Sequence, residues 1–125
     1  LPAPDLIKID AQYTEAAVLM GGVKTISQNK PMIVLENCLN FKDSLKTVVP
    51  LRFLESIGYQ LYYPCWINSK EKLLIPSAVQ NNNYSSGVLA LYPLRSEDRF
   101  LYSEMINVFA CHKSQIERLR GLFGE

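Results

Sequence analysis

The sequence has 125 residues, of which 48% are apolar and 20% charged, and a formal net charge of +1. These values describe one globular domain or a piece of one. Charges of both signs are scattered without a basic stripe, so neither nucleic acid nor an anionic membrane surface is expected as a partner. The apolar runs are too short to cross a bilayer. No basic segment followed by an apolar stretch opens the chain, so no signal peptide is expected.

Cysteine and histidine usage bears on the cellular compartment and on metal binding. The chain has three widely spaced cysteines, Cys38, Cys65 and Cys111, and a single histidine, His112. An odd number of cysteines without a C-x-x-C pair is typical of a reducing compartment, so a cytoplasmic location is expected. The same inventory predicts no zinc site. Because adjacent residues on a helix point in different directions, Cys111 and His112 are not predicted to form a catalytic pair.

The first 37 residues predict a strand, a helical stretch and a second strand. The short, uninterrupted apolar runs Leu6–Ile9 and Met32–Leu35 are typical of strands buried on both faces of a parallel sheet. The residues between them, Glu15–Ile26, have helical spacing and are long enough for a parallel crossover connection. Gly21-Gly22 weakens the middle of this helix by about 1 kcal/mol per glycine relative to alanine, so two short helices are an alternative.

The rest of the chain predicts shorter elements. A polar connection over residues 37–47 precedes a short helix at Pro50–Ile57, in which Pro50 occupies the first turn and Gly58 follows the C-terminus. The apolar spacing over Glu97–Phe123 predicts a helical tail. The strands predicted between them are Tyr59–Tyr63 with an extension to Ile67, Leu73–Ile75 and Val88–Tyr92, and the clearest loop is Asn81–Gly87. Together these elements predict an α/β fold.

Two carboxylates mark a candidate site. Asp10 follows the first predicted strand and Glu36 ends the second. In open α/β sheets ligands bind beyond the carboxyl ends of the strands, so we expect both side chains at one edge of the sheet. Magnesium held by the two carboxylates is an alternative, because oxygen ligands suit that ion, but two carboxylates alone do not define a metal site and no metal is predicted. In the plainer alternative, these residues cap the following segments or pair with Lys8 or Lys30.

Five blocks of the chain follow one another at spacings that resemble a known family. The blocks are Ile7-Lys8-Ile9-Asp10-Ala11-Gln12-x-x-Glu15, Val18-Leu19-x-Gly21, Lys30-Pro31-x-Ile33-x-x-Glu36, Leu54-x-x-x-Gly58-Tyr59 and the strand Val88–Tyr92. In this order they resemble the C-terminal half of an FkbM-type methyltransferase over residues 4–95. The first block is the most specific part of the resemblance, because its acidic and amide residues recur at set offsets.

The resemblance implies a Rossmann-like methyltransferase that uses S-adenosylmethionine and methylates oxygen of a small molecule or sugar. It implies the C-terminal portion of the sheet, equivalent to the fourth to seventh of seven strands, mostly parallel, with flanking helices and an antiparallel last strand. It also implies that residues 1–125 form a single partial domain. Asp10 and Glu36 would be catalytic, Asp10 and Gln12 would contact the cofactor, and Glu15 matches the acidic residue that opens the next helix.

Two features depart from the family pattern. Tyr13 stands where the family has glycine, which permits a tight turn and a close approach of a ligand. No block of the sequence matches the glycine-rich turn after a first strand or the acidic residue that holds a ribose. Most of the cofactor pocket is therefore expected to lie outside these 125 residues.

A non-catalytic function is the alternative. A sheet that begins with the apolar strand Leu6–Ile9 has an open edge, and a second copy of the chain can pair there to form a homodimer. A different α/β enzyme, such as a nucleotide hydrolase, ranks last because the sequence contains no phosphate-binding loop.

Overall fold

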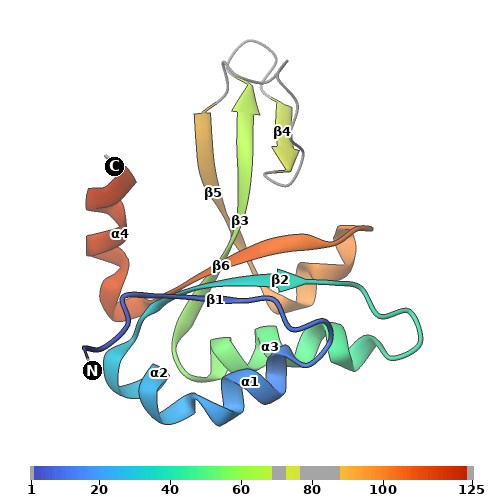
Figure 1. Cartoon of the computed structure of the whole chain (residues 1–125). Helices are drawn as coiled ribbons and strands as arrows, with labels where there is room; N and C mark the ends of the chain where they lie inside the picture. Colours follow the sequence, from blue (N-terminus) through green and yellow to red (C-terminus); the bar gives the residue numbers. More distant parts are fainter. Residues whose placement is uncertain (1, 69–72, 77–87, 124–125) are drawn as a thin grey trace.

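The computed structural model describes residues 2–68, 73–76 and 88–123, which build one mixed sheet with helices on both faces (Figure 1). The strand order is β1-β2-β6-β3-β4, and β5 also pairs with β3. The strands are β1 (Leu6–Ile9), β2 (Met32–Asn37), β3 (Tyr59–Asn68), β4 (Leu73–Pro76), β5 (Val88–Leu94) and β6 (Ile106–His112). The helices are α1 (Glu15–Gly21), α2 (Val23–Asn29), α3 (Ser44–Ser56), α4 (Ile116–Phe123) and the 3-10 helices η2 (Ser96–Leu101) and η3 (Lys113–Gln115).

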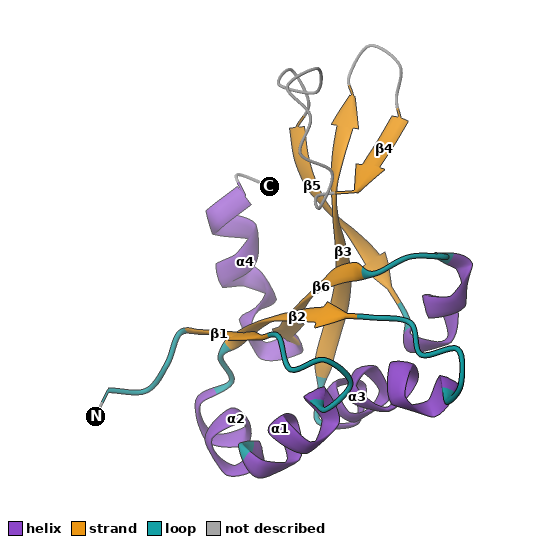
Figure 2. Ribbon diagram, turned by 45° about the vertical axis from the view of Figure 1, so that its right-hand side comes forward, coloured by secondary structure: helices purple, strands orange, loops and turns teal. Residues whose placement is uncertain are grey.

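The sheet separates a large core from a small one. Helices α1, α2 and α3 lie on one face, and α4 lies on the other (Figure 2). Side chains alternate between the faces of a strand, so β2 directs Ile33 and Leu35 into the large core and Met32 toward α4. The small core beneath α4 is built by Met32, Cys111 and Leu119. The large core includes Ile9, Leu19, Ile33, Leu35, Leu51, Leu54, Leu61, Val108 and Ala110.

The α/β class is confirmed, but the prediction of a mostly parallel sheet is wrong. Among the described strands only β1 and β2 are parallel, and the other four pairings are antiparallel. One reason is that β4 and β5 both run antiparallel to the long strand β3, with which they pair. The other reason is that β6 lies between β2 and β3 and runs opposite to both. It follows that β2 and β3 run in the same direction.

The N-terminal strand–helix–strand unit forms as predicted, with the helical stretch divided in two. Gly22 separates α1 from α2, and its N–H donates to the carbonyl of Val18 at 3.0 Å. Helix α2 ends at Lys30, whose φ of 50° lies in the left-handed region. Pro31 follows and cannot continue a helix, so the chain turns into β2.

Helix α3 is longer than the predicted segment Pro50–Ile57, and Pro50 lies in its interior. The helix begins at Ser44 because Asp43 caps it by accepting a hydrogen bond from the Leu45 N–H at 3.2 Å. An interior proline costs a helix about 3 kcal/mol. Burial of one face of the helix offsets this cost, and that face consists of Thr47, Val48, Pro50, Leu51 and Leu54.

The helical tail predicted over Glu97–Phe123 is wrong for most of its length. The segment contains η2, then strand β6, and only the last turns form α4. Strand β6 directs Val108 and Ala110 into the large core and packs Phe109 and Cys111 on the α4 side. A strand buried on both faces is apolar at nearly every position, so its pattern resembles that of a buried helix.

The predicted strands over residues 59–67, 73–75 and 88–92 are confirmed as β3, β4 and β5. Strands β4 and β5, together with the end of β3 that pairs with them, project from the body of the sheet as an antiparallel extension (Figure 1). The predicted loop Asn81–Gly87 lies outside the described residues. Within the described ranges no helix combines the length and the apolar character that a membrane span requires.

Candidate functional site

The parallel register of β1 and β2 brings the two predicted carboxylates together. Ile9 pairs with Leu35 at the last position of the ladder, so Asp10 and Glu36 follow one residue later on adjacent strands. Ile9 and Leu35 point into the large core, and alternation therefore places Glu36 on the other face of the sheet. Asp10 is exposed and Glu36 is half-buried. The structure thus places both carboxylates at the carboxyl ends of the neighbouring strands β1 and β2, while their catalytic role stays a prediction.

The proximity of the two carboxylates changes the acidity of Glu36. Its pKa is raised above the ordinary value, first by burial, then by repulsion from Asp10 and by a hydrogen bond to Asp10, while Lys8 acts in the opposite direction. Glu36 therefore keeps its proton to a higher pH than a solvated glutamate. A carboxyl group with a raised pKa is better suited to accept or donate a proton near neutral pH.

Replacing Glu36 by glutamine is expected to make the stability of the protein depend differently on pH. A raised pKa in the folded state stabilises the folded wild type at low pH, and this stabilisation is lost as pH rises from the ordinary value of 4.5 through the folded pKa. Glutamine does not titrate, so the free energy of unfolding of the variant relative to wild type should rise between pH 4 and pH 7. Urea unfolding of wild type and variant at pH 4 and at pH 7 measures this difference in the free energy of unfolding. A relative stability that falls over this range contradicts the prediction.

The turn after β1 adopts a backbone that is unusual for its residues. Gln12 and Tyr13 have φ values of 41° and 74°, both in the left-handed region. For residues other than glycine this region costs about 1–2 kcal/mol each. The Tyr13 hydroxyl donates to the carbonyl of Leu39 at 3.3 Å, and its N–H donates to Oε1 of Glu15 at 3.2 Å. Tyr13 thus keeps a turn conformation that glycine adopts easily, and its side chain bridges to the loop after β2.

The other predicted residues of this turn have different surroundings. Gln12 is exposed at the turn, two residues after Asp10. Glu15 is 3% exposed and opens α1. An acidic side chain at the first turn of a helix is favourable, because it interacts with the positive end of the helix dipole. Glu15 is therefore a structural residue at the base of the turn, consistent with the helix-opening role implied for it.

A buried threonine holds the loop after β2. The Thr47 hydroxyl donates to the carbonyl of Cys38 at 3.3 Å and accepts from the N–H of Asn40 at 2.8 Å. The carbonyl of Thr47 accepts from Nδ2 of Asn37 at 3.0 Å. Asn40 in turn accepts from the N–H of Asp43 at 3.0 Å, next to the start of α3. These bonds explain why the connection between β2 and α3 is rich in polar residues.

Replacing Thr47 by valine is expected to lower the free energy of unfolding by roughly 1–3 kcal/mol. Valine has nearly the same shape but leaves the Asn40 N–H and the Cys38 carbonyl without their partner at a site that is 0% exposed. Chemical denaturation measures the change, and Thr47→Ser, which keeps the hydroxyl, is the control. Equal stability of the valine and serine variants would contradict the hydrogen-bonding role.

Sequence analysis missed Arg99, which is the largest fully buried side chain of the described residues. Its Nε donates to Oδ1 of Asn37, and its Nη2 donates to the carbonyl of Asn37 at 2.9 Å. The guanidinium also donates to the carbonyls of Tyr102 at 2.9 Å and Glu104 at 2.8 Å. The sequence contains no signal for its burial, because an arginine in the helix predicted over residues 97–123 is expected on the surface.

Cys38 lies among the charged groups of the site. Burial raises the pKa of its thiol, and Glu36, Glu15 and Asp10 raise it further, whereas Arg99 lowers it. All three cysteines are free thiols. The imidazole of His112 contacts the Ser114 hydroxyl at 2.8 Å through Nδ1. In the part of the chain that the structure describes, no group of three or more histidine, cysteine or acidic residues is arranged to hold a metal ion.

The fold and the site define an α/β protein with a mixed sheet, in which two carboxylates lie where the parallel strands β1 and β2 end. Residues 1–61 match the family model of the methyltransferase FkbM domain, so the resemblance is confirmed for these 61 of the 125 residues. Residues 1–61 therefore correspond to part of a methyltransferase FkbM domain, and this segment includes Asp10, Gln12 and Glu36. No curated protein and no solved structure was found to match the chain.

Proposed function

We propose that the chain is the C-terminal portion of an S-adenosylmethionine-dependent methyltransferase that methylates oxygen of a small molecule or sugar. The observation that carries the proposal is the overlap of two findings. The family match covers residues 1–61, and within it the paired strands β1 and β2 bring Asp10 and Glu36 together at their carboxyl ends.

The order of the strands supports a Rossmann-like methyltransferase arrangement. The resemblance implies a last strand that is antiparallel to its neighbours. In the order β1-β2-β6-β3, the antiparallel strand β6 lies between two strands that run in the same direction. The last strand of the proposed arrangement is therefore β6, and β5, which was expected in that place, pairs with β3 instead.

The residues at this edge suit one end of the cofactor. S-adenosylmethionine carries a positively charged sulfonium that supplies the methyl group when the cofactor is bound. Among the described residues, Glu36 is repelled by Asp10 and by Glu15, and Lys8 is the one cation that acts on it. The three carboxylates give this end of the strands a negative charge, which favours such a cation. The sequence lacks a match to the elements that hold the ribose and the adenosine, so we propose that residues preceding this chain supply them.

The chemistry of the edge follows from general acid–base catalysis. An acceptor hydroxyl must lose its proton as its oxygen forms a bond to the methyl group. The oxygen must approach in line with the methyl–sulfur bond that breaks. We assign Asp10 to orient the hydroxyl and accept its proton. Glu36 raises the local negative charge beside Asp10, and Gln12 offers an amide that can hydrogen-bond the cofactor. The free thiols are in keeping with a cytoplasmic enzyme.

Calorimetric titration of S-adenosylmethionine into the purified 125-residue chain tests the proposal, with S-adenosylhomocysteine as the second ligand. Micromolar binding would show that these residues form enough of a pocket by themselves. If the folded chain does not bind, the titration is repeated with the chain joined to the sequence that precedes it. Absence of binding in both forms contradicts the proposal.

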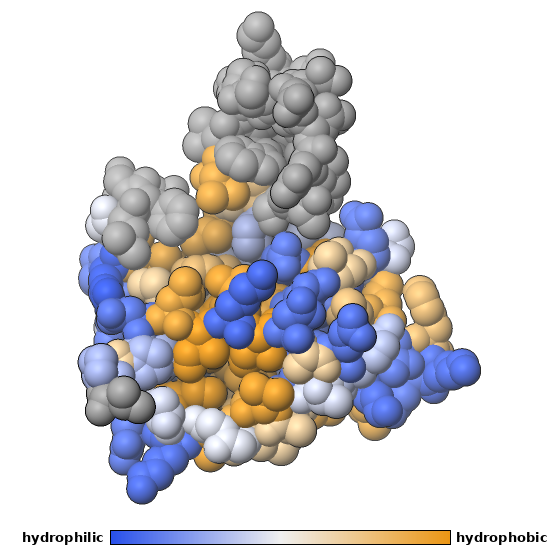
Figure 3. Space-filling model, viewed as in Figure 1, coloured by the Kyte–Doolittle hydropathy of each residue, from blue (hydrophilic) through white to orange (hydrophobic). Residues whose placement is uncertain are grey.

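Self-association is the second candidate, because one edge of the sheet is open. Among the described strands, β1 is first in the strand order and pairs with β2 alone, and Leu6 is 56% exposed. Hydrophobic surface is exposed in the region of the first strands (Figure 3). The Met32 N–H donates to the Asp5 carbonyl at 2.9 Å, so the alternating pattern of a parallel ladder directs the N–H groups of Leu6 and Lys8 outward.

This pattern provides a specific test of dimerisation through β1. Lys8→Pro removes an outward N–H without removing a bond to β2, whereas Lys8→Ala keeps the N–H and changes the side chain alone. Sedimentation velocity over a concentration series should show dimers for the wild type and for Lys8→Ala, and monomers for Lys8→Pro. A wild type that remains monomeric at high concentration rules out this second candidate.

A further inference from the structure

Arg99 is a buried cation whose hydrogen-bond acceptors are all neutral. It is 0% exposed, and its acceptors are the side-chain and main-chain oxygens of Asn37 and the carbonyls of Tyr102 and Glu104. No ion pair to Arg99 exists within the described ranges. Burying a charge without a counter-charge is costly, and an apolar side chain of similar volume would fill the space at lower cost. The guanidinium at this position therefore needs an explanation other than packing.

The geometry of the guanidinium provides that explanation. Its planar fork holds several acceptors in fixed directions, which lysine does not do. Here the fork joins the last residue of β2, Asn37, to the segment 102–104 that leads into β6. Asn37 stands between Glu36 and Cys38 in the chain. The end of β2 that carries the candidate site is thus tied to a second element through one side chain.

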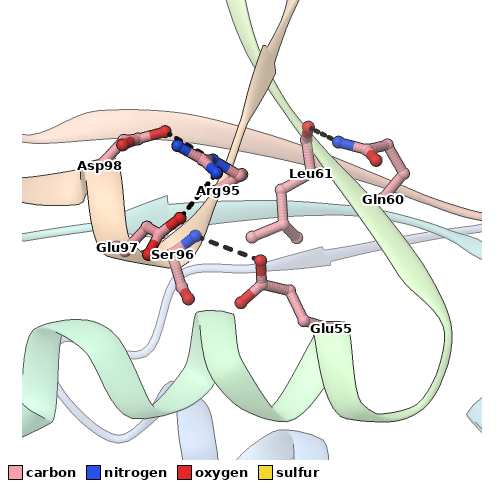
Figure 4. A network of polar contacts seen from close by, with 7 residues as sticks. All are labelled: Glu55, Gln60, Leu61, Arg95, Ser96, Glu97 and Asp98. Atoms are coloured by element: carbon pink, nitrogen blue, oxygen red, sulfur yellow. Dashed lines mark hydrogen bonds and ion pairs between the residues drawn. The ribbon is translucent and has the colours of Figure 1, made fainter.

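The element that carries Arg99 is itself anchored. The N–H of Ser96, at the start of η2, donates to Oε2 of Glu55 on α3 at 3.2 Å (Figure 4). Arg95 pairs with Glu97 at 2.8 Å and with Asp98 at 3.3 Å on the exposed side of the same turn, where ion pairs contribute little to stability. Because η2 is held against α3, the Arg99 side chain extends from a fixed base to the end of β2.

We propose that Arg99 is a positioning residue of the candidate site, which holds Asn37 and thereby keeps Glu36 and Cys38 in place beside Asp10. We call the hydrogen bonds from Arg99 to Asn37, Tyr102 and Glu104 the Arg99 clamp. Only the importance of this clamp for methyl transfer rests on the proposed function. Arg99 contacts neither of the two carboxylates through a hydrogen bond in the described structure, so it acts through Asn37 and through its positive charge.

Cys38 is a built-in reporter of this clamp. It is half-buried, whereas Cys65 and Cys111 are both 0% exposed, so iodoacetamide should alkylate Cys38 first in the folded protein. Three carboxylates, Asp10, Glu15 and Glu36, raise the pKa of this thiol, and one cation, Arg99, lowers it. The rate of alkylation as a function of pH has a midpoint that reports the charge around the thiol and a plateau that reports its exposure.

The experiment compares Arg99→Met, Arg99→Lys and the control Arg95→Met in the 125-residue chain, with peptide mass spectrometry to follow each cysteine. Arg99→Met should move the Cys38 midpoint to higher pH, because the carboxylates remain and the cation is lost, and should raise the plateau several-fold. Arg99→Lys should keep the midpoint close to wild type but raise the plateau, because the charge stays and the fork is lost. Arg95→Met should change neither.

Two results would overturn the proposal. One is an unchanged midpoint and plateau for Cys38 in Arg99→Met. The other is an equal increase in the reactivity of Cys38, Cys65 and Cys111 in Arg99→Lys, which would show general loosening of the fold. If Arg99→Met does not fold, the Arg99→Lys result decides by itself. Alkylation requires neither cofactor nor acceptor, so a failure of the proposed methyl transfer leaves this result intact.

Discussion

Replacing Gly58 by alanine is expected to lower the free energy of unfolding by roughly 2–4 kcal/mol. Gly58 follows the C-terminus of α3 with a φ of +93°, a conformation that residues with a Cβ rarely adopt. A Cβ at this position would lie 2.7 Å from Nε2 of His112, well inside van der Waals contact. Backbone strain and the steric conflict therefore act together, and urea unfolding of wild type and variant measures their sum.

Two further variants separate these causes. Gly121→Ala in α4 is the matched control, because a Cβ there has no neighbour within 4 Å and alanine favours a helix over glycine by about 1 kcal/mol. This control should be slightly more stable than wild type. In a His112→Ala background the steric conflict is absent, so Gly58→Ala should cost only the backbone strain, about 1–2 kcal/mol. An equal cost in both backgrounds would show that His112 does not contribute.

Replacing Asp10 by asparagine is expected to reduce turnover by about 100-fold or more in a form of the protein that binds S-adenosylmethionine. Asparagine has the same shape and can still orient a hydroxyl, but it cannot accept the proton. The variant should fold at least as well as wild type, because the repulsion between Asp10 and Glu36 is removed. Single-turnover kinetics with a radiolabelled methyl group measure the chemical step apart from binding.

Asp5→Asn provides the control for the Asp10 variant. Asp5 precedes β1 at its opposite end, is exposed, and pairs with Arg118 at 3.3 Å. An exposed pair of this kind contributes little to stability, about 0–1 kcal/mol, so Asp5→Asn should leave turnover unchanged. Near-normal turnover of Asp10→Asn would remove Asp10 from the mechanism, whereas equal losses in both variants would indicate a general effect of the lost negative charge.

The sequence by itself determined the N-terminal half of the fold and the location of the candidate site. The apolar runs of β1 and β2, the glycine pair between α1 and α2 and the glycine after α3 are local signals, because each depends on the conformational limits of a few neighbouring residues. Once β1 and β2 are parallel neighbours, the position of Asp10 and Glu36 at the same edge follows from their place after each strand.

Only the tertiary structure decided the pairing of the strands, the fold of the segment after β5 and the extent of α3. Strand β6 is apolar on both faces because the large core lies on one side of it and α4 covers the other, a position that its own residues do not reveal. Pro50 is tolerated within α3 because the surrounding face of that helix is buried. Arg99 is buried because its acceptors at Asn37, Tyr102 and Glu104 come together only after the sheet has formed. Local conformational preferences thus determined the first elements, whereas contacts between distant residues decided which segments became strands and which buried polar groups met.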